Sequence, residues 1–430
     1  MDSSYATIRH KITLTLAVVT FALPLAAQEQ TTDTSLPESA SATSIYPDIP
    51  QFGGPSSVGG QLAEDAATIP EFRWQRLQNA FGPWYGFKER LNEHCGLQFN
   101  IDESMFYQTV TDSLGETEAA SGLVRFYGQW ELLGRGTDTP GMLVFKGENR
   151  HRMGSDITPF DLGFEAGSIL PTGTFFSEFG FGVTNLYWKQ YACSGDVTFA
   201  VGVIDVTDFV DVYAMMNPLT HFINLAFSTN PTIAAPNQGL GAAAGAMLTE
   251  HLYVQGGFAD ANGQPTTAGF DTFFDDAEYF SYAEFGLTSS QDRIYLDNIH
   301  LTLWHTDARQ VAGTPEGHGV SFTAQRFVGD KWLPFFRFGY ADGDAALMQT
   351  TFSTGLGLHR ENLDVVGLGF SWGSPAEGAL GDQFTSEAFY RFQLTQFLAV
   401  TPDVQLIVDP ALNPDEDVLA FFGVRLRAAL

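Results

Sequence analysis

Charged side chains stand at every second position in several short segments of this sequence. In the segment MLVFKGENRHR, the residues Lys146, Glu148, Arg150 and Arg152 alternate with residues that carry no charge. Because successive side chains of a β-strand point to opposite faces, these four would form one row on one face. Guanidinium and carboxylate groups give directional hydrogen bonds, and aromatic rings offer faces for a ring-shaped solute. Such a row favours weak, reversible contact with a polar solute.

The opposite face of these segments is apolar, and this indicates what surrounds them. In the last segment, VLAFFGVRLRAAL, apolar residues alternate from Val418 to Leu430, and Arg425 and Arg427 fall on the other face. Arginine facing lipid at mid-depth costs roughly 2–4 kcal/mol, so both should face a water-filled lumen. The same parity elsewhere predicts a pore-lining, solute-binding set: Arg125, Tyr127, Glu131, Lys146, Glu148, Arg150, Arg152, Arg337, Glu387, Arg391, Asp403, Gln405, Arg425 and Arg427. The alternative is that these charges neutralise one another and keep the lumen hydrated.

Segments with a period of two begin near residue 97 and continue to the end of the chain. About sixteen candidate strands can be placed, one of them near residues 174–190. Brief connections such as CSGD alternate with long ones such as residues 206–240. Short turns at one end and long loops at the other are typical of outer-membrane barrels. The sequence therefore predicts an all-β fold, a transmembrane antiparallel β-barrel with a short N-terminal amphipathic helix.

Composition divides the chain into four regions. Residues 1–27 carry basic residues before the apolar run ITLTLAVVTFALPLAA and are predicted to be a signal peptide; the alternative, a transmembrane anchor, is disfavoured because the run is short and contains Pro24. Residues 28–70 are rich in Ser, Thr, Pro and Gly and are interpreted as a flexible periplasmic leader, with a small plug as the alternative. Residues 71–96 contain the predicted helix, and residues 97–430 form the barrel.

The long connection at residues 206–240 is predicted to constrict the pore, because it is too apolar and aromatic to be a freely exposed loop. Asp205, Asp208 and Asp211 lie at its start. Their spacing matches no complete metal motif, so solvation or pairing with arginine is favoured over cation binding.

The charge balance limits the partners of the chain. Acidic residues number 50 and basic residues 21, for a formal net charge of −29. This argues against binding to nucleic acid or to an anionic membrane surface. The 44 glycines and 38 phenylalanines suit curved strands, tight turns and an apolar belt in lipid.

Two cysteines, Cys95 and Cys193, are placed at the same end of the predicted barrel. Cys95 ends the predicted helix, and Cys193 lies in the turn after the fourth predicted strand. Export to an oxidising compartment permits a disulfide, so we hypothesise one between them that tethers the helix.

Motifs for metal, cofactor or catalytic chemistry are weak. The nine histidines form no H-E-x-x-H or similar ligand pair, and DANGQP puts Pro265 where a calcium loop requires glycine. GLGAAAG lacks the βαβ context of a nucleotide loop. We predict no metal, no cofactor and no enzyme activity.

Several segments resemble the carbohydrate-selective porins of the OprB family: GVIDVTDFVDVY, NPTIAAPNQGLGAAAG, GGFADANGQPT and the C-terminal stretch from SEAFYRFQ to RLRAAL. The resemblance extends from about Trp84 to the C-terminus. It implies a sixteen-stranded barrel behind an N-terminal helix, with inward-folded loops, that passes sugars passively and forms a homotrimer. It also implies a place in the outer membrane of a Gram-negative bacterium, surrounded by lipid. The chain ends on a strand, as substrates of the outer-membrane assembly machinery do, although its last residue is Leu430 rather than phenylalanine.

Three other functions stay open at this stage. A general porin would pass solutes by size without preferring sugars. A barrel-borne enzyme would need a nucleophile beside a rim histidine, and none of the histidines has a recognisable partner. A secreted soluble β-protein that binds or hydrolyses sugars would need no detergent for extraction.

Overall fold

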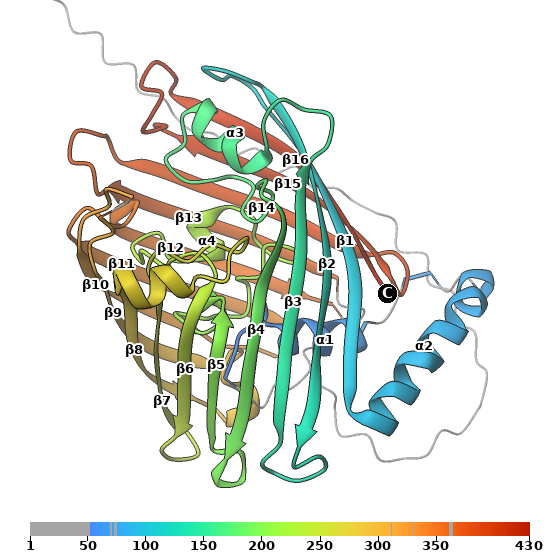
Figure 1. Cartoon of the computed structure of the whole chain (residues 1–430). Coiled ribbons are helices and arrows are strands. Elements are labelled where there is room, and N and C mark those ends of the chain that lie inside the picture. The colour runs from blue at the N-terminus through green and yellow to red at the C-terminus, as the bar shows by residue number, and fades with distance from the viewer. Residues whose placement is uncertain (1–51, 69–70, 73–74, 311, 330, 361–363) are drawn as a thin grey trace, which may run out of the picture. The chain divides into compact units, whose positions relative to one another are not determined.

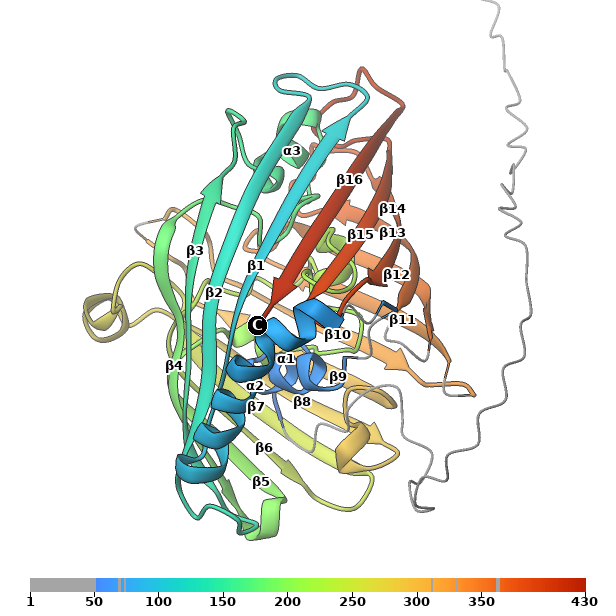
Figure 2. The ribbon, with the colours of Figure 1, turned by 90° about the vertical axis from the view of Figure 1, so that its right-hand side faces the viewer.

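Sixteen antiparallel strands form a closed barrel in the computed structural model (Figures 1 and 2). The structure describes residues 52–68, 71–72, 75–310, 312–329, 331–360 and 364–430, all of which belong to one compact unit, Ser44–Leu430. Each strand pairs with the next, and the first pairs with the last from Asp102↔Ala429 to Val110↔Phe421. The predicted fold class is confirmed. Among the described residues, no helix is long and apolar enough to cross a membrane.

The strands are β1 Leu97–Val110, β2 Glu118–Leu133, β3 Gly141–Arg152, β4 Gly180–Ala192, β5 Val197–Ile204, β6 Gly239–Met247, β7 Leu252–Asp260, β8 Tyr279–Thr288, β9 Asn298–Thr306, β10 Gly317–Gln325, β11 Trp332–Asp342, β12 Met348–His359, β13 Val365–Pro375, β14 Gln383–Gln393, β15 Leu398–Val408 and β16 Val418–Ala429. The helices are α1 Val58–Ala66, α2 Gln75–Cys95, α3 Pro159–Ala166 and α4 Leu225–Ser228, with short helical turns η1 Cys193–Gly195, η2 Val206–Asp208, η3 Thr272–Asp276 and η4 Gln291–Arg293.

Strand β4 shows the largest difference from the predicted boundaries. The predicted strand begins at residue 174, whereas β4 begins at Gly180, whose φ of 72° lies in the left-handed region. Phe175 also has a positive φ, so the residues before Gly180 cannot continue an extended strand. Their aromatic side chains belong instead to the long loop between β3 and β4.

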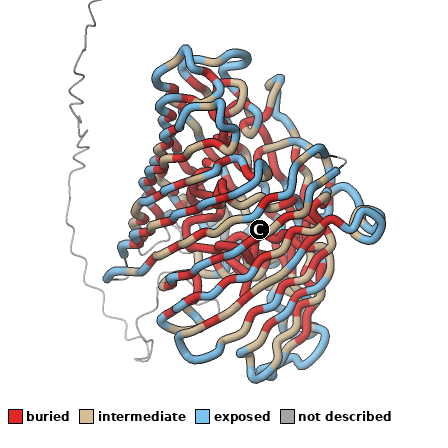
Figure 3. The backbone as a smooth tube through the Cα atoms, turned by 90° about the vertical axis from the view of Figure 1, so that its left-hand side faces the viewer, coloured by how far each residue is buried: buried red, intermediate tan, exposed pale blue. Residues whose placement is uncertain are grey.

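Along the strands, buried residues alternate with exposed ones (Figure 3). In β16, Phe422, Val424 and Leu426 are exposed on the outside, while Arg425 and Arg427 are buried. Exposed apolar side chains of this kind recur on most strands, and such an apolar outer face is typical of a barrel in a membrane. The inner face is buried because other parts of the chain fill the lumen.

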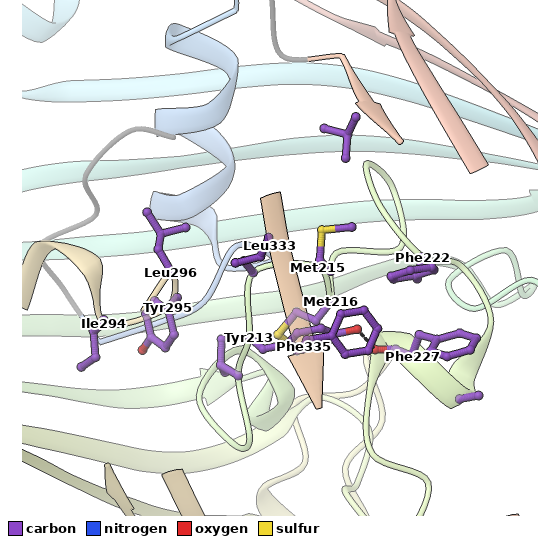
Figure 4. Close-up of a cluster of buried hydrophobic side chains, with 14 of the residues drawn as sticks. Tyr213, Met215, Met216, Phe222, Phe227, Ile294, Tyr295, Leu296, Leu333 and Phe335 are labelled. Carbon is purple, nitrogen blue, oxygen red and sulfur yellow. Dashed lines mark hydrogen bonds between the residues drawn. The ribbon is translucent and has the colours of Figure 1, made fainter. Parts of the chain in front are cut away.

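The connection between β5 and β6 folds into the barrel; residues 205–238 are named the inner loop here. Its apolar side chains, among them Tyr213, Phe222 and Phe227, pack against Leu333 and Phe335 of the wall (Figure 4). The rings of Phe222 and Phe335 lie 5.7 Å apart. The hydrophobic core of this protein therefore lies inside the barrel, where the sequence placed a constricting loop.

Residues 52–68, named the N-terminal segment here, also lie inside the barrel (Figure 2). The segment contains α1, which begins after Ser57, whose side chain accepts a hydrogen bond of 3.2 Å from the Gly60 amide. Such capping stabilises a helix start by about 1 kcal/mol. Residues 28–70 are predicted to be a flexible leader, with a small plug as the alternative; of these, residues 52–68 form an ordered segment that is largely buried in the lumen. Residues 28–51 lie outside the described residues.

Helix α2 lies at the end of the barrel that carries the short turns, against β1 and β2 (Figure 2). The Trp84 ring packs edge-on against Phe99 of β1, with centroids 5.7 Å apart. The helix occupies the region where the sequence predicts one, and it is longer than expected because Pro83 does not end it.

The hypothesised disulfide is not formed. Cys95 and Cys193 are both free, and the Cys95 thiol donates a hydrogen bond of 3.0 Å to the Leu91 carbonyl. Both residues do lie at the short-turn end, but Cys95 precedes β1 and Cys193 follows β4, so β2 and β3 lie between them. Three strand spacings amount to about 14 Å, roughly twice the Cα separation that a disulfide spans.

Lipid contact on the outer face can be tested at Phe352, an exposed residue in the middle of β12 whose ring packs against Phe336. Phe352→Arg should lower the free energy of unfolding by roughly 2–4 kcal/mol, because the charge would enter lipid. Phe352→Leu should lose less than about 1.5 kcal/mol. Urea unfolding in lipid vesicles measures both values, and equal losses would contradict a lipid-facing position.

Candidate functional site

Asp211 anchors the start of the inner loop to the barrel wall. Its carboxylate accepts hydrogen bonds from Arg337 at 2.5 Å, His300 at 2.9 Å and Thr323 at 2.8 Å, and all four side chains are buried. The Asp211 amide donates to the Glu284 carboxylate at 3.0 Å. Burial alone would raise the pKa of Asp211, but the neighbouring Arg337 and His300 hold it well below its usual value. The ion pair therefore persists throughout the neutral and mildly acidic range.

A second anchor holds the middle of the inner loop. The Glu387 carboxylate accepts hydrogen bonds from the amides of Ile223 at 2.7 Å and Asn224 at 2.9 Å. The Asn224 side chain donates to Gln405 at 2.8 Å, and Gln405 in turn donates to Asp403 at 2.9 Å. Buried amides of a folded-in loop need acceptors, and these wall residues supply them.

Arg425 holds the same part of the loop from the other side. Its guanidinium donates to the Pro218 carbonyl and, at 2.9 Å, to the His221 carbonyl. Burial and the nearby His359 lower the pKa of His221 well below its usual value, so this ring is neutral at physiological pH. Arg337, Glu387, Gln405 and Arg425 thus each bind the inner loop directly.

Helix α1 is held by a separate group of charges. Arg391 pairs with Glu64, and Arg427 pairs with Asp65 and with Asp102 of β1, both at 2.8 Å. All five side chains are almost completely buried. Burial alone would raise the pKa of Asp65, but Arg427 beside it holds this pKa below the usual value.

Arg125 and Tyr127 of β2 complete this group. Arg125 donates to Asp102 at 2.8 Å and to Gln61 of α1 at 3.4 Å, and the Tyr127 hydroxyl donates to Asp65. The structure thus brings together Arg125, Tyr127, Arg391 and Arg427 around α1, a partner that strand parity could not indicate.

The charged row Lys146, Glu148, Arg150 and Arg152 lies on β3 and runs toward the long-loop end of the barrel. Glu148 accepts from Arg150 at 2.7 Å and lies 3.8 Å from Lys146. Arg152 lies at the exposed rim and pairs with Glu178 at 2.6 Å. Glu131, near the short-turn end of β2, is half-buried.

Arg150 lines a cavity of about 700 Å³ at the long-loop end, named the long-loop chamber. Its guanidinium carbon lies 4.9 Å from the ring centroids of both Phe175 and Phe179. The inner loop forms the floor, and Gln238 and Gln264 add carboxamide groups. Arg150 is the one residue of the predicted pore-lining set that lines the long-loop chamber.

Sequence reasoning missed the aromatic residues of this chamber, Phe160, Phe164, Phe175 and Phe179. They lie on the loop between β3 and β4. Phe160 and Phe164 fall outside the predicted strands, and Phe175 and Phe179 fall in the part of the predicted strand 174–190 that is a loop in the structure. The only available signal was the density of phenylalanine in DITPFDLGFEAGSILPTGTFFSEFGF.

A second cavity of about 740 Å³ lies at the short-turn end, named the short-turn chamber. Helix α1 contributes Leu62 and Asp65, helix α2 contributes Tyr85 and Lys88, and the strand ends contribute carboxamides such as Gln129. Of the residues that the structure describes, none lines both chambers. The inner loop and α1 lie between them.

The remaining aspartates at the start of the inner loop bind neighbouring groups. Asp205 accepts from the Gln238 side chain at 2.6 Å, and Asp208 accepts from Asn185 at 3.3 Å. Burial raises the pKa of Asp208 to about 6, with Lys146 opposing and Asp205 adding to the shift. Among the described residues, no group of three or more His, Cys, Asp or Glu side chains is arranged to hold a metal ion.

A closed strand barrel with an apolar outer face and a loop folded into its lumen defines a porin of the outer membrane. The model of the carbohydrate-selective porin, OprB family, matches residues 179–430, more than half of the chain. The chain belongs to this family.

Individual relatives are distant. The chain is 27% identical over 123 residues to porin AaxA of Chlamydia pneumoniae, covering 26% of this chain and 28% of that protein. It is 25% identical over 215 residues to porin AaxA of Chlamydia felis, covering 47% and 48%. The chain therefore spans about half or less of the length of these curated relatives. The high-pH structure of Pseudomonas putida OprB matches with a TM-score of 0.64 at 14% identity, covering 81% of this chain and 97% of that one, which shows the shared fold.

The ion pair between Asp211 and Arg337 predicts that the inner loop becomes less ordered when the Arg337 guanidinium is removed. Arg337→Gln leaves a buried carboxylate short of its partner, so the free energy of unfolding should fall by about 3–5 kcal/mol and the inner loop should become sensitive to protease. Arg360→Gln, at the exposed turn after β12, should change it by less than about 0.5 kcal/mol. An inner loop that stays resistant to protease in Arg337→Gln would contradict the anchor.

Asp208 predicts a pH dependence of stability. Its folded pKa of about 6 exceeds the ordinary value of 3.8, so protonation favours the folded state; this contribution is complete below pH 3.8 and is lost as the pH rises through 6. Asp208→Asn mimics the protonated form. The difference in urea midpoint between this variant and the wild type should therefore narrow from pH 7.5 to pH 5, and a constant difference would contradict the shift.

Proposed function

We propose that this protein lets sugars diffuse across the outer membrane of a Gram-negative bacterium through a narrowed pore, after removal of residues 1–27. The observation that carries the proposal is the long-loop chamber, where Arg150 lies between the rings of Phe175 and Phe179. A pyranose ring has apolar C–H faces for stacking and hydroxyl groups at its edge for hydrogen bonds. A cation flanked by aromatic rings offers both at one place.

The other groups of the chamber favour a neutral polyhydroxylated solute. Gln238 and Gln264 each offer a donor and an acceptor, and Glu178 adds an acceptor. Arg150 already shares its charge with Glu148, so the site does not require an anionic ligand. Contacts of this kind are weak enough for release, which passage through a pore requires.

The other residues of the predicted pore-lining set have a structural role in this proposal. Most of these charges hold the inner loop and α1, as their ion pairs and hydrogen bonds indicate, and so they shape the pathway without touching solute. The chain acts as a channel rather than an enzyme. Assembly by the outer-membrane machinery and a homotrimeric state, implied by the family, are part of the proposal.

Swelling of proteoliposomes with mono-, di- and larger saccharides, beside amino acids of similar size, tests the proposed preference. Arg150→Ala should slow sugar entry roughly fivefold, as expected for the loss of about 1 kcal/mol from one hydrogen-bonding group, and change amino-acid entry less. Arg360→Ala removes the same charge at the exposed turn after β12, away from the chamber, and should leave sugar entry near the wild-type rate.

Two results would overturn the sugar preference. Entry of all solutes ranked by size alone would indicate a general porin, the second candidate. No swelling from a folded sample would indicate that the barrel conducts no solute.

A further inference from the structure

The N-terminal segment occupies the part of the lumen that the inner loop leaves open. The inner loop binds wall residues of β9, β11, β14 and β16, whereas α1 binds residues of β1, β2, β14 and β16, and the residues just before it bind β4. Helix α1 forms one wall of the short-turn chamber, and the inner loop forms the floor of the long-loop chamber. The two pieces meet where Asn217 donates to Pro55 and to Gln61, at 3.2 and 3.0 Å.

The charged row on β3 leads from the long-loop chamber directly to α1. Arg150 lines that chamber, Glu148 is its ion-pair partner, and Glu148 stands opposite Arg125 in the register of β2 and β3. Arg125 contacts Gln61 of α1. This buried polar row therefore connects the wall of the long-loop chamber to the N-terminal segment, which lines the short-turn chamber.

The fit of the segment against its surroundings is close. The Phe52 ring packs beside Tyr253 and over Gly245 of β6, where an added Cβ would fall 2.5 Å from the ring. An added Cβ on Gly54 would fall 2.2 Å from Val212 of the inner loop. Glycine at these two positions leaves the space that the contact fills.

The segment is nevertheless separable from the barrel. All sixteen strands pair with each other and none pairs with residues 52–66, so removing the segment from the lumen breaks no strand pairing. Its polar contacts are to side chains of the wall, including Lys189 of β4, to the Tyr295 hydroxyl, and to the inner loop. Its charged groups, Glu64 and Asp65, are both acidic and both pair with wall arginines.

We propose that residues 52–66 are a displaceable plug that closes the lumen between the two chambers, so that solute passes only when this segment leaves its position. The inference rests on the proposed function only in requiring that the barrel conducts. Departure of the plug also removes two carboxylates from Arg391 and Arg427, so the open lumen gains positive charge. Opening should therefore raise conductance and shift ion selectivity toward anions.

An opening variant tests the plug in the full-length protein. Gly245→Ala combined with Glu64→Gln and Asp65→Asn removes the space for Phe52 and both ion pairs. Planar-bilayer recordings should show a mean conductance at least about fivefold above wild type, and the reversal potential in a salt gradient should move toward anions. Glu250→Gln combined with Asp292→Asn removes two exposed carboxylates from the short turns and should change neither value.

A locking variant gives the opposite test. Gln61→Cys and Asn217→Cys, with both native cysteines replaced by serine, join α1 to the inner loop through a reducible bis-methanethiosulfonate reagent. Conductance should fall on cross-linking and recover on reduction, and the cysteine-free parent should respond to neither step. Heat-modifiable gel mobility confirms that each variant is folded.

The results separate the plug from the proposed function. Wild-type conductance and selectivity in the folded opening variant, or unchanged conductance in the locked one, would overturn the plug. A larger conductance with sugar entry ranked by size alone would support the plug and overturn the sugar preference. No conductance in either the wild type or the opening variant would overturn both.

Discussion

The ion pairs and hydrogen bonds between the barrel wall and the inner loop are the interactions on which the rest of this structure depends. A sixteen-stranded barrel is too wide for its own side chains to fill, so an interior core has to come from elsewhere in the chain. The inner loop supplies that core, but its backbone amides are buried with it. Glu284, Gln325 and Glu387 accept hydrogen bonds from four of these amides, so a polar wall is what allows an apolar loop to fold inside.

The barrel and the direction of its strand side chains could be predicted from the sequence, because lipid on one side enforces a strict period of two. The same rule would have identified Glu284 and His300, which alternate with outward residues in β8 and β9. It could not identify their partners. Asp211 lies on a loop and Asp65 on a helix, and contacts between such elements depend on three-dimensional packing that no local spacing encodes.

The features that the sequence did not predict also depend on three-dimensional packing. The disulfide hypothesis placed Cys95 and Cys193 at the correct end but ignored the two strands between them. The polar composition of residues 28–70 favoured a flexible leader, although Phe52 and the capped helix α1 pack in the lumen. The long-loop chamber is lined by phenylalanines of a loop, and the alternation of side chains along strands does not predict where loop side chains point. At 14% identity to the Pseudomonas putida protein the fold is retained.

The place of α1 in the chain imposes an order on assembly in the membrane. The helix precedes β1, and the barrel closes only when β1 pairs with β16, the last strand to be synthesised. A segment that contacts both β2 and β16 has no complete binding site until that seam forms. The helix therefore either enters a finished barrel or is enclosed as β1 pairs with β16. In both cases α1 can form all of its contacts only after β1 and β16 have paired and closed the barrel.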